Sequence, residues 1–171
     1  MTLKELFWSK GYEYYPTDKD THHNYLTAYS ELLGKWETAN INILEVGTWK
    51  GGSMKLFEEY FVNANIFGYD IIQPEVPLSR AKVIIKDFYS SDTGELPELT
   101  IAIDDGPHGI QEQLKFVRMV YPKMVKGGIL VVEDVRTDFN LHFNSLNIPY
   151  TLIETFPATD EDDDRLLIFR K

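Results

Sequence analysis

The chain of 171 residues contains no cysteine. This absence excludes disulfides and thiolate metal sites, and it fits a protein of the reducing cytoplasm. The sequence also lacks any apolar run near the roughly 20 residues that a helix needs to span a bilayer. Its first residues include an acid where a signal peptide would have an apolar core. We therefore expect a cytoplasmic protein that has no membrane partner.

Positive charge is scarce as well, because 17 Lys and Arg residues stand against 27 Asp and Glu residues, a formal net charge of −10. Nucleic-acid backbones are bound by concentrated basic faces, so we expect no nucleic-acid partner. Part of the acidic excess is local, in residues 160–164. We interpret that run as a solvated loop between two strands, with a metal-buffering or partner-binding role as the alternative.

The length is typical of one domain, and no linker or repeat divides residues 1–171. Residues 1–35 are expected to form a helical cap or lid. Their apolar spacing predicts a helix at residues 3–10 and a second, amphipathic helix at residues 24–34. An aromatic patch and a polar turn lie between the two helices, and we interpret the patch, Tyr12, Tyr14 and Tyr15, as a packing surface.

A short apolar run at residues 41–46 leads into three glycines, Gly47, Gly51 and Gly52, and then into a helical pattern. This order is typical of a site for a nucleotide-like ligand, although a plain strand-to-helix turn has the same pattern. The spacing differs from the Gly-x-Gly-x-x-Gly of dinucleotide sites, and Glu45 would repel a phosphate. Both observations argue against a nicotinamide-dependent oxidoreductase. We expect Ser53 to cap the helix that follows.

Further apolar runs of strand length follow, separated by helical stretches at residues 55–63 and 110–121 and by a loop at residues 71–80. Near-continuous apolar strands indicate a parallel sheet buried on both faces. We expect the fold class to be α/β: a Rossmann-like three-layer α/β/α sandwich with a mostly parallel seven-stranded sheet and an antiparallel last strand. The expected strands cover residues 41–46, 65–70, 81–87, 99–105, 129–134, 150–154 and 165–169, with a turn at residues 126–128 before the fifth.

Each of the first five strands carries an acid at or near its C-terminal end, where open α/β sheets bind their ligands. Asp70 stands where an acceptor for ribose hydroxyls belongs, and a turn aspartate is the alternative. Asp87 and Phe88 would suit an amino group and the wall of a base ring, or again a turn. We expect the acids to converge on one edge, where compensating cations or hydroxyls are needed: Glu45, Asp70, Asp87, Asp104, Asp105, Glu133 and Asp134.

The most specific set is Asp105, Glu133 and Asp134, which two neighbouring strands would bring together at their tips. Carboxylates of this kind are the ligands that Mg²⁺ prefers. His108 follows three residues after Asp105 and would stand beside the metal as a general base, with a hydrogen-bonded loop histidine as the alternative. We interpret His22 and His23 as solvated or capping residues, with a role as ligands as the alternative, and His142 as structural.

Four segments of the sequence together carry a resemblance to a known family. They are Glu45-Val-Gly-Thr-Trp-Lys-Gly-Gly-Ser53, Asp104-Asp-Gly-Pro-His108, Glu133-Asp134, and Thr17-Asp-Lys-Asp-Thr-His-His-Asn-Tyr25 followed by Tyr29. The chain resembles class I S-adenosylmethionine-dependent methyltransferases from about Thr17 to its C-terminus. Within that class it is most similar to the metal-dependent sugar O-methyltransferases of macrolide biosynthesis.

The resemblance implies S-adenosyl-L-methionine and Mg²⁺ as cofactors. It implies that Asp105, Glu133 and Asp134 bind the metal, that His108 is the base, and that Asp105 shares the catalytic role. The cofactor contacts that we expect are Glu45, Gly47, Thr48, Gly51, Ser53, Asp70, Asp87, Phe88, Asp104 and Tyr25. Two positions depart from the family, which often has Ser in place of Pro107 and Gly in place of Asp20.

The expected activity is transfer of a methyl group to a hydroxyl of a sugar or other small molecule. Because acceptor-covering segments of the family are longer than residues 1–25, we expect that segment or a neighbouring subunit of a homo-oligomer to cover the acceptor. The alternative is a catalytically inactive S-adenosylmethionine-binding protein that acts as a subunit or sensor.

Overall fold

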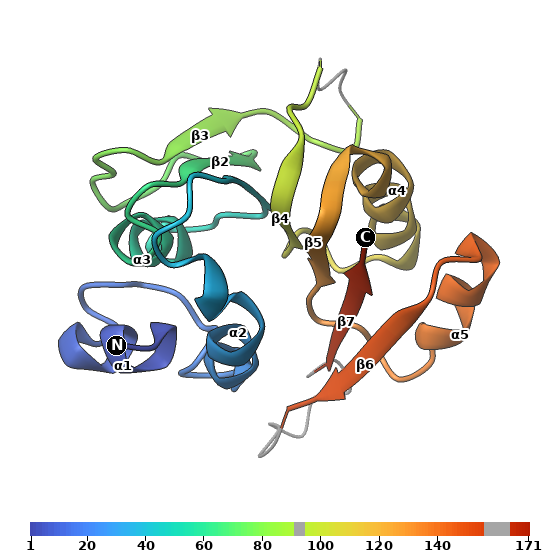
Figure 1. Cartoon of the computed structure of the whole chain (residues 1–171), viewed down its shortest axis with the longest axis horizontal. Coiled ribbons are helices and arrows are strands. Elements are labelled where there is room, and N and C mark those ends of the chain that lie inside the picture. The colour runs from blue at the N-terminus through green and yellow to red at the C-terminus, as the bar shows by residue number, and fades with distance from the viewer. Residues whose placement is uncertain (91–94, 156–164) are drawn as a thin grey trace.

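The computed structural model describes residues 1–90, 95–155 and 165–171. Its described strands form a seven-stranded sheet in the order β3-β2-β1-β4-β5-β7-β6 (Figure 1). Strands β1 to β5 pair in parallel, whereas β7 is antiparallel to both β5 and β6. The expected fold class is therefore confirmed. The strands are β1 (Asn42–Val46), β2 (Asn65–Asp70), β3 (Lys82–Ile85), β4 (Leu99–Asp104), β5 (Met124–Val132), β6 (Tyr150–Glu154) and β7 (Arg165–Arg170).

Helices cover both faces of the sheet, which gives three layers (Figure 1). One face packs against α1 (Leu3–Lys10), α2 (Tyr25–Leu33) and α3 (Gly52–Tyr60), and the other against α4 (Ile110–Val120) and α5 (Asn140–Phe143). Alternation along each strand separates the two cores, because successive strand residues point to opposite faces. Ile43 belongs to the first core and Leu44 to the second. Short 3₁₀ turns follow three helices, at Gly34–Trp36, Tyr121–Lys123 and Asn144–Leu146.

The N-terminal segment is packed firmly onto α3. A capping box between Thr2 and Glu5 begins α1, and the helix buries Leu3 and Phe7. The Glu59 carboxylate on α3 accepts hydrogen bonds from Lys10 Nζ at 2.5 Å and from the Tyr15 hydroxyl at 2.6 Å. Of the aromatic patch, Tyr15 is buried as predicted, whereas Tyr12 and Tyr14 stay partly exposed.

Several predicted details were wrong. Ser53 does not cap α3, which begins at Gly52 after Gly51 in a left-handed conformation and has no side-chain cap. The predicted turn at residues 126–128 lies inside β5, since that strand starts at Met124 and pairs with Leu99 across a register shift. Strand β3 lies at the sheet edge rather than buried on both faces, so that Ile84 and Ile85 are each 40% exposed.

Two other expectations concern membrane-spanning helices and the acidic run. No helix among the described residues is long and apolar enough to cross a membrane. The acidic run at residues 160–164 lies outside the described residues, so its interpretation stays a prediction.

Candidate active site

The ends of the parallel strands open into a cavity of about 570 Å³. Its walls come from the loops after β1, β2, β3 and β4, and from Pro16, Thr17 and Asp18 of the N-terminal segment. This is the edge at which open α/β sheets bind their ligands. Of the predicted site residues, the structure brings eight to the cavity wall: Gly47, Thr48, Ser53, Asp70, Asp87, Phe88, Asp105 and His108.

The loop after β1 needs a glycine at its first position. Gly47 has a φ of +84°, and a Cβ atom there would lie 1.7 Å from the Asp105 carbonyl oxygen. Asp70 holds the same loop, because its Oδ2 atom accepts the backbone N–H of Thr48 at 2.6 Å and of Trp49 at 2.7 Å. The turn role considered for Asp70 is thus present, and the carboxylate also faces the cavity.

Asp87 and Phe88 line the cavity on the β3 side. The Asp87 carboxylate accepts hydrogen bonds from the backbone N–H groups of Tyr89 at 2.9 Å and Ser90 at 3.2 Å, which is the turn role considered as its alternative. Phe88 is buried and packs edge-on against Tyr69. An aromatic wall with a carboxylate beside it therefore closes this end of the cavity.

Deeper in the edge, three carboxylates surround a lysine that the sequence analysis did not single out. Lys19 Nζ lies 2.6 Å from Asp105 Oδ2, 2.7 Å from Glu133 Oε1 and 3.3 Å from Glu45 Oε1. We call Glu45, Asp105 and Glu133 the inner cluster. A lysine in a polar turn is usually exposed, and no periodicity in residues 16–23 indicates that Lys19 is buried.

A second group, which we call the outer cluster, consists of Asp105, His108 and Asp134. His108 Nε2 lies 3.1 Å from Asp134 Oδ2 and 3.4 Å from Asp105 Oδ1. Asp105 therefore belongs to both clusters, with one oxygen toward Lys19 and the other toward His108. The predicted trio of Asp105, Glu133 and Asp134 is thus divided between two neighbouring groups.

Hydroxyl groups donate to one oxygen of each of four buried carboxylates. Ser53 donates to Glu45 Oε2 at 2.6 Å, which is what its side chain does instead of capping the helix. Tyr25 donates to Asp134 Oδ1 at 2.5 Å. Tyr29 donates to Glu133 and Tyr89 to Asp104. Such partners offset the cost of burying charge. Two of the four, Tyr25 and Tyr29, belong to α2.

Five predicted cofactor or metal residues lie away from the cavity wall. Glu45, Asp104, Glu133, Asp134 and Tyr25 are buried behind it. Gly51 is not on the wall either, and it serves α3 as its left-handed N-cap. Their roles toward a ligand stay predictions.

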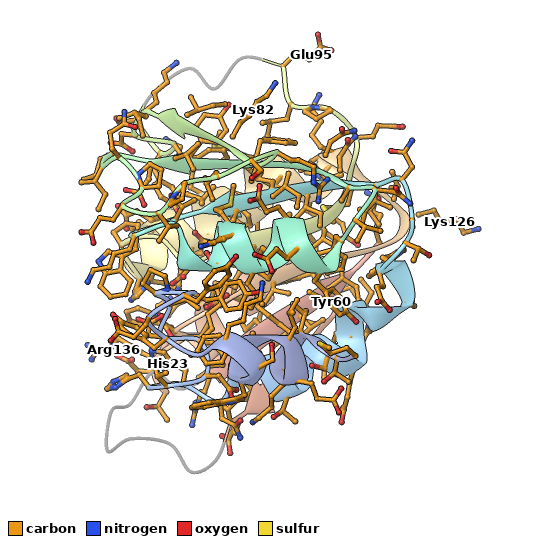
Figure 2. The ribbon with its side chains drawn as sticks, turned by 90° about the vertical axis from the view of Figure 1, so that its left-hand side faces the viewer. His23, Tyr60, Lys82, Glu95, Lys126 and Arg136 are labelled. Atoms are coloured by element: carbon orange, nitrogen blue, oxygen red, sulfur yellow. The ribbon has the colours of Figure 1, made fainter. Side chains whose placement is uncertain are left out.

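The predicted histidines differ from one another. His22 is exposed, as predicted. His23 is buried, stacks on the Tyr25 ring with centroids 4.8 Å apart, and lies 3.8 Å from Asp134, so its solvated interpretation was wrong. Figure 2 shows His23 at the end of the molecule opposite Lys126. His142 is exposed on α5.

Burial sets the charge state of the edge. It raises the pKa of Glu45 and of Asp104 to about 7, and that of Asp134 to about 6. Burial alone would lower the pKa of His108, but the hydrogen bond with Asp105 and the charges of Asp134 and Asp105 raise it to about 9. The imidazole therefore carries a proton at neutral pH in the presence of these carboxylates alone.

The backbone is also strained here. Trp49, His108 and Asp134 have φ values of 43°, 56° and 52°, a region that is costly for residues other than glycine. Gln113 on α4 donates through Nε2 to the carbonyl oxygens of Glu133 at 3.0 Å and Asp134 at 3.3 Å, which fixes the turn after β5. Strain of this kind is concentrated at functional sites.

The outer cluster has the donors that a divalent cation needs. One ligand atom each from Asp105, His108 and Asp134 lie within 4.8 Å of one another. Two carboxylate oxygens beside a cavity are typical of Mg²⁺ sites, which keep positions open for water or substrate. The residues present therefore fit a metal ion at this edge.

Comparison with known proteins agrees with this geometry, although no family model matches the chain. The 8-demethyl-8-alpha-L-rhamnosyl tetracenomycin-C 2'-O-methyltransferase of Streptomyces olivaceus is 26% identical over 138 residues, which are 72% of this chain and 36% of that protein. Demethylmacrocin O-methyltransferase of Streptomyces fradiae is 26% identical over 132 residues, 68% of this chain and 33% of the relative. The chain thus spans about a third of the length of these relatives.

Among solved structures, the MycE methyltransferase of mycinamycin biosynthesis, in complex with Mg and SAH, superposes with a TM-score of 0.73 at 20% identity. The match covers 100% of this chain and 53% of that chain. The chain is therefore similar in sequence to these O-methyltransferases and has a Rossmann-like fold, as its motifs led us to expect.

Proposed function

We propose that the protein transfers a methyl group from S-adenosylmethionine to a hydroxyl of a sugar or similar small molecule, assisted by a divalent cation. The observation that carries this proposal is the position of His108, which lies on the cavity wall with Asp105 and also contacts Asp134 behind that wall. A base beside two metal-type ligands, next to a nucleoside-sized cavity, fits oxygen methylation. The sugar O-methyltransferases among the relatives support the same chemistry.

The cavity would hold the methyl donor. Its volume of about 570 Å³ lies in the range of cofactor pockets. Asp70 would accept the ribose hydroxyls through lone pairs that its backbone contacts leave free, and Phe88 would flank the adenine with Asp87 at its amino group. Gly47 and Thr48 would face the amino-acid end. Ser53 would face the donor from the cavity wall. Glu45, Asp104, Gly51 and Tyr25 would support this wall from behind.

Asp105, on the cavity wall, and Asp134, buried behind it, would bind the cation. Glu133, held by Lys19 and Tyr29, would lie beside them as the third predicted carboxylate. When bound, Mg²⁺ supplies positive charge that favours a deprotonated acceptor oxygen and offsets the carboxylates that keep the proton on His108. Asp105 Oδ1 faces the protonated imidazole at Nε2. Once that carboxylate engaged a cation, Nε2 would be left free to accept a proton. His108 would then take the acceptor proton at Nε2 while the acceptor oxygen attacks the methyl carbon in line with the departing sulfur.

The N-terminal segment would be part of this one catalytic domain. We propose that residues 1–35 act as a cap, since Pro16, Thr17 and Asp18 supply one wall of the cavity and Lys19, Tyr25 and Tyr29 reach the carboxylates beneath it. A neighbouring copy of the chain could complete the acceptor side in a homo-oligomer.

The test compares wild type with His108→Ala. Calorimetric titration with S-adenosylhomocysteine, with Mg²⁺ and with chelator, should give micromolar binding to both proteins, differing by less than about threefold because His108 acts on the acceptor. Methyl transfer to sugar-bearing acceptors should fall by roughly 10²- to 10⁴-fold in the variant. His142→Ala, which changes an exposed histidine on α5, is the matched control and should keep full activity.

Two outcomes would contradict the proposal. If wild type binds no S-adenosylhomocysteine in either titration, the cofactor class is wrong. If it binds the cofactor but the His108→Ala rate equals that of wild type, the histidine is not the base. Cofactor binding without transfer to any acceptor would instead favour an inactive binding protein.

A further inference from the structure

Lys19 is a fully buried ammonium group that the proposed chemistry does not use as an acid or base. Its Nζ atom contacts Asp105 Oδ2 at 2.6 Å, both oxygens of Glu133 at 2.7 and 2.8 Å, and Glu45 Oε1 at 3.3 Å. An ammonium group at these distances balances carboxylate charge that would otherwise be buried without a cation.

The three carboxylates around Lys19 have the spacing of a metal site. One ligand atom each from Glu45, Asp105 and Glu133 lie within 4.8 Å of one another. Glu45 Oε1 has no hydrogen-bond partner among the described residues, although it is buried, and its contact is the ion pair with Lys19. Lys19 is therefore the charged partner of this buried oxygen, which would be left without one if the ammonium group were removed.

The inner and outer clusters are neighbours that share Asp105. Its Oδ2 atom faces Lys19 and its Oδ1 atom faces His108. The acidic edge therefore offers two adjacent cation positions bridged by one carboxylate. This is the arrangement of two-metal sites, in which the ions lie about 3.5–4 Å apart.

We propose that Lys19 is a built-in cation that fills the inner position and thereby limits the protein to one divalent cation at the outer cluster. The inference rests on the proposed function, which requires that outer cation. Two-metal sites stabilise an attacking and a leaving oxygen, whereas methyl transfer from a sulfonium has only the acceptor oxygen to orient. A tethered ammonium neutralises the second position without providing a second Lewis acid.

The test is the number of Mn²⁺ ions bound per chain in Lys19→Met, which keeps a long unbranched side chain but removes the charge. Titration followed by the electron paramagnetic resonance of free Mn²⁺ should give one ion for wild type and two for Lys19→Met. Since Asp105 would bridge the two ions, the loaded variant should also show the broadened signal of a spin-coupled pair, which wild type lacks.

Two controls separate site chemistry from net charge. Lys126→Met removes the same charge from an exposed position at the opposite end of the molecule from His23 (Figure 2), and it should bind one ion. The double variant Lys19→Met/Glu45→Gln should also return to one ion, because the inner cluster then lacks a ligand. One ion in Lys19→Met, or two in wild type, would overturn the proposal.

Failure of the inference is distinguishable from failure of the proposed function. A wild type that binds no Mn²⁺ contradicts the metal-assisted reaction itself. A wild type that binds S-adenosylhomocysteine and one Mn²⁺, beside a Lys19→Met that also binds one, contradicts only the role of Lys19. If Lys19→Met does not fold, Lys19→Gln is titrated in the same way. If neither folds in millimolar Mn²⁺, the proposal is overturned, because it requires that a second cation replace the ammonium.

Discussion

At the scale of single residues, the site depends on the absence of a Cβ atom at Gly47 and on the contacts of the Asp105 side chain. The loop after β1 passes so close to the Asp105 backbone that only a residue without a Cβ atom fits at Gly47. The Asp105 side chain is shared between Lys19 and His108. The conformation of this loop therefore sets both the cavity wall and the position of the carboxylate that joins the two clusters.

We expect Gly47→Ala to lower the free energy of unfolding by about 2–4 kcal/mol, the sum of a positive φ and a backbone clash. Gly127→Ala is the matched control, because Gly127 has a φ of +83° but open space around its Cβ position. This variant should lower the free energy of unfolding by about 1–2 kcal/mol, because only its backbone conformation is unfavourable. Urea denaturation of both variants measures the difference. Equal losses would show that the contact with Asp105 relaxes without cost.

At the scale of elements, α3 connects the glycine-rich loop to the chain that enters β3. The Glu58 carboxylate on α3 accepts the backbone N–H groups of Ser79 at 3.0 Å, Arg80 at 2.7 Å and Ala81 at 2.9 Å. Arg80 in turn donates to carbonyl oxygens at the end of α3. This exchange fixes the chain that enters β3, the edge strand, whose strand partner among the described residues is β2.

We expect Glu58→Gln to lower the free energy of unfolding by about 1.5–3 kcal/mol at pH 7, because an amide offers one acceptor oxygen to three donors. Burial by itself would raise the pKa of Glu58, but the three N–H groups outweigh it and hold the pKa below its ordinary value of 4.5. A lowered folded-state pKa means stability that is present above pH 4.5 and lost as the pH falls through the folded value.

The difference between wild type and Glu58→Gln should therefore shrink when denaturation is repeated below pH 4.5. Glu31→Gln, an exposed change on α2, should stay within about 0.5 kcal/mol of wild type at both pH values. A difference that is independent of pH would mean that the carboxylate charge is not what holds the connection.

At the scale of the whole molecule, the acidic edge joins parts of the chain that are far apart in sequence. Lys19 is 86 residues from Asp105 and 114 residues from Glu133, and Tyr25 is 109 residues from Asp134. The N-terminal segment thus forms part of the electrostatic centre of the fold. Lys19 carries one positive charge, whereas the three carboxylates of the inner cluster surround it.

We expect Mg²⁺ to raise the melting temperature more than NaCl of equal ionic strength, since a specific ligand stabilises the folded state by mass action. At about 100 times its dissociation constant it should add about 2.7 kcal/mol, or roughly 5–10 °C for a chain of this size. Asp134→Asn should lose most of this shift in thermal denaturation. Equal shifts from both salts would indicate screening rather than a bound ion.

The sequence alone determined the seven strands and four of the five helices in their order, whereas the short helix α5 was not predicted. Apolar runs and glycines located the strands, and an acid at each strand end indicated the ligand-binding edge, because parallel strands end on the same side of a sheet. The same local patterns gave a wrong prediction where strand pairing outweighed the preference of glycines for a turn. Residues 126–128 became strand because Met124 pairs with Leu99, although two glycines there favoured a turn.

Only the tertiary structure decided which groups meet. Glu133 and Asp134 are neighbours in sequence, yet one faces Lys19 and the other His108, because the backbone turns at Asp134 with a φ of 52°. Likewise, Ser53 bonds Glu45 rather than the end of its helix. Hydrogen bonds and ion pairs of this kind act over a few ångströms, between residues that local spacing does not relate. Sequence periodicity therefore gives the positions of the acids, whereas their partners depend on how the whole chain folds.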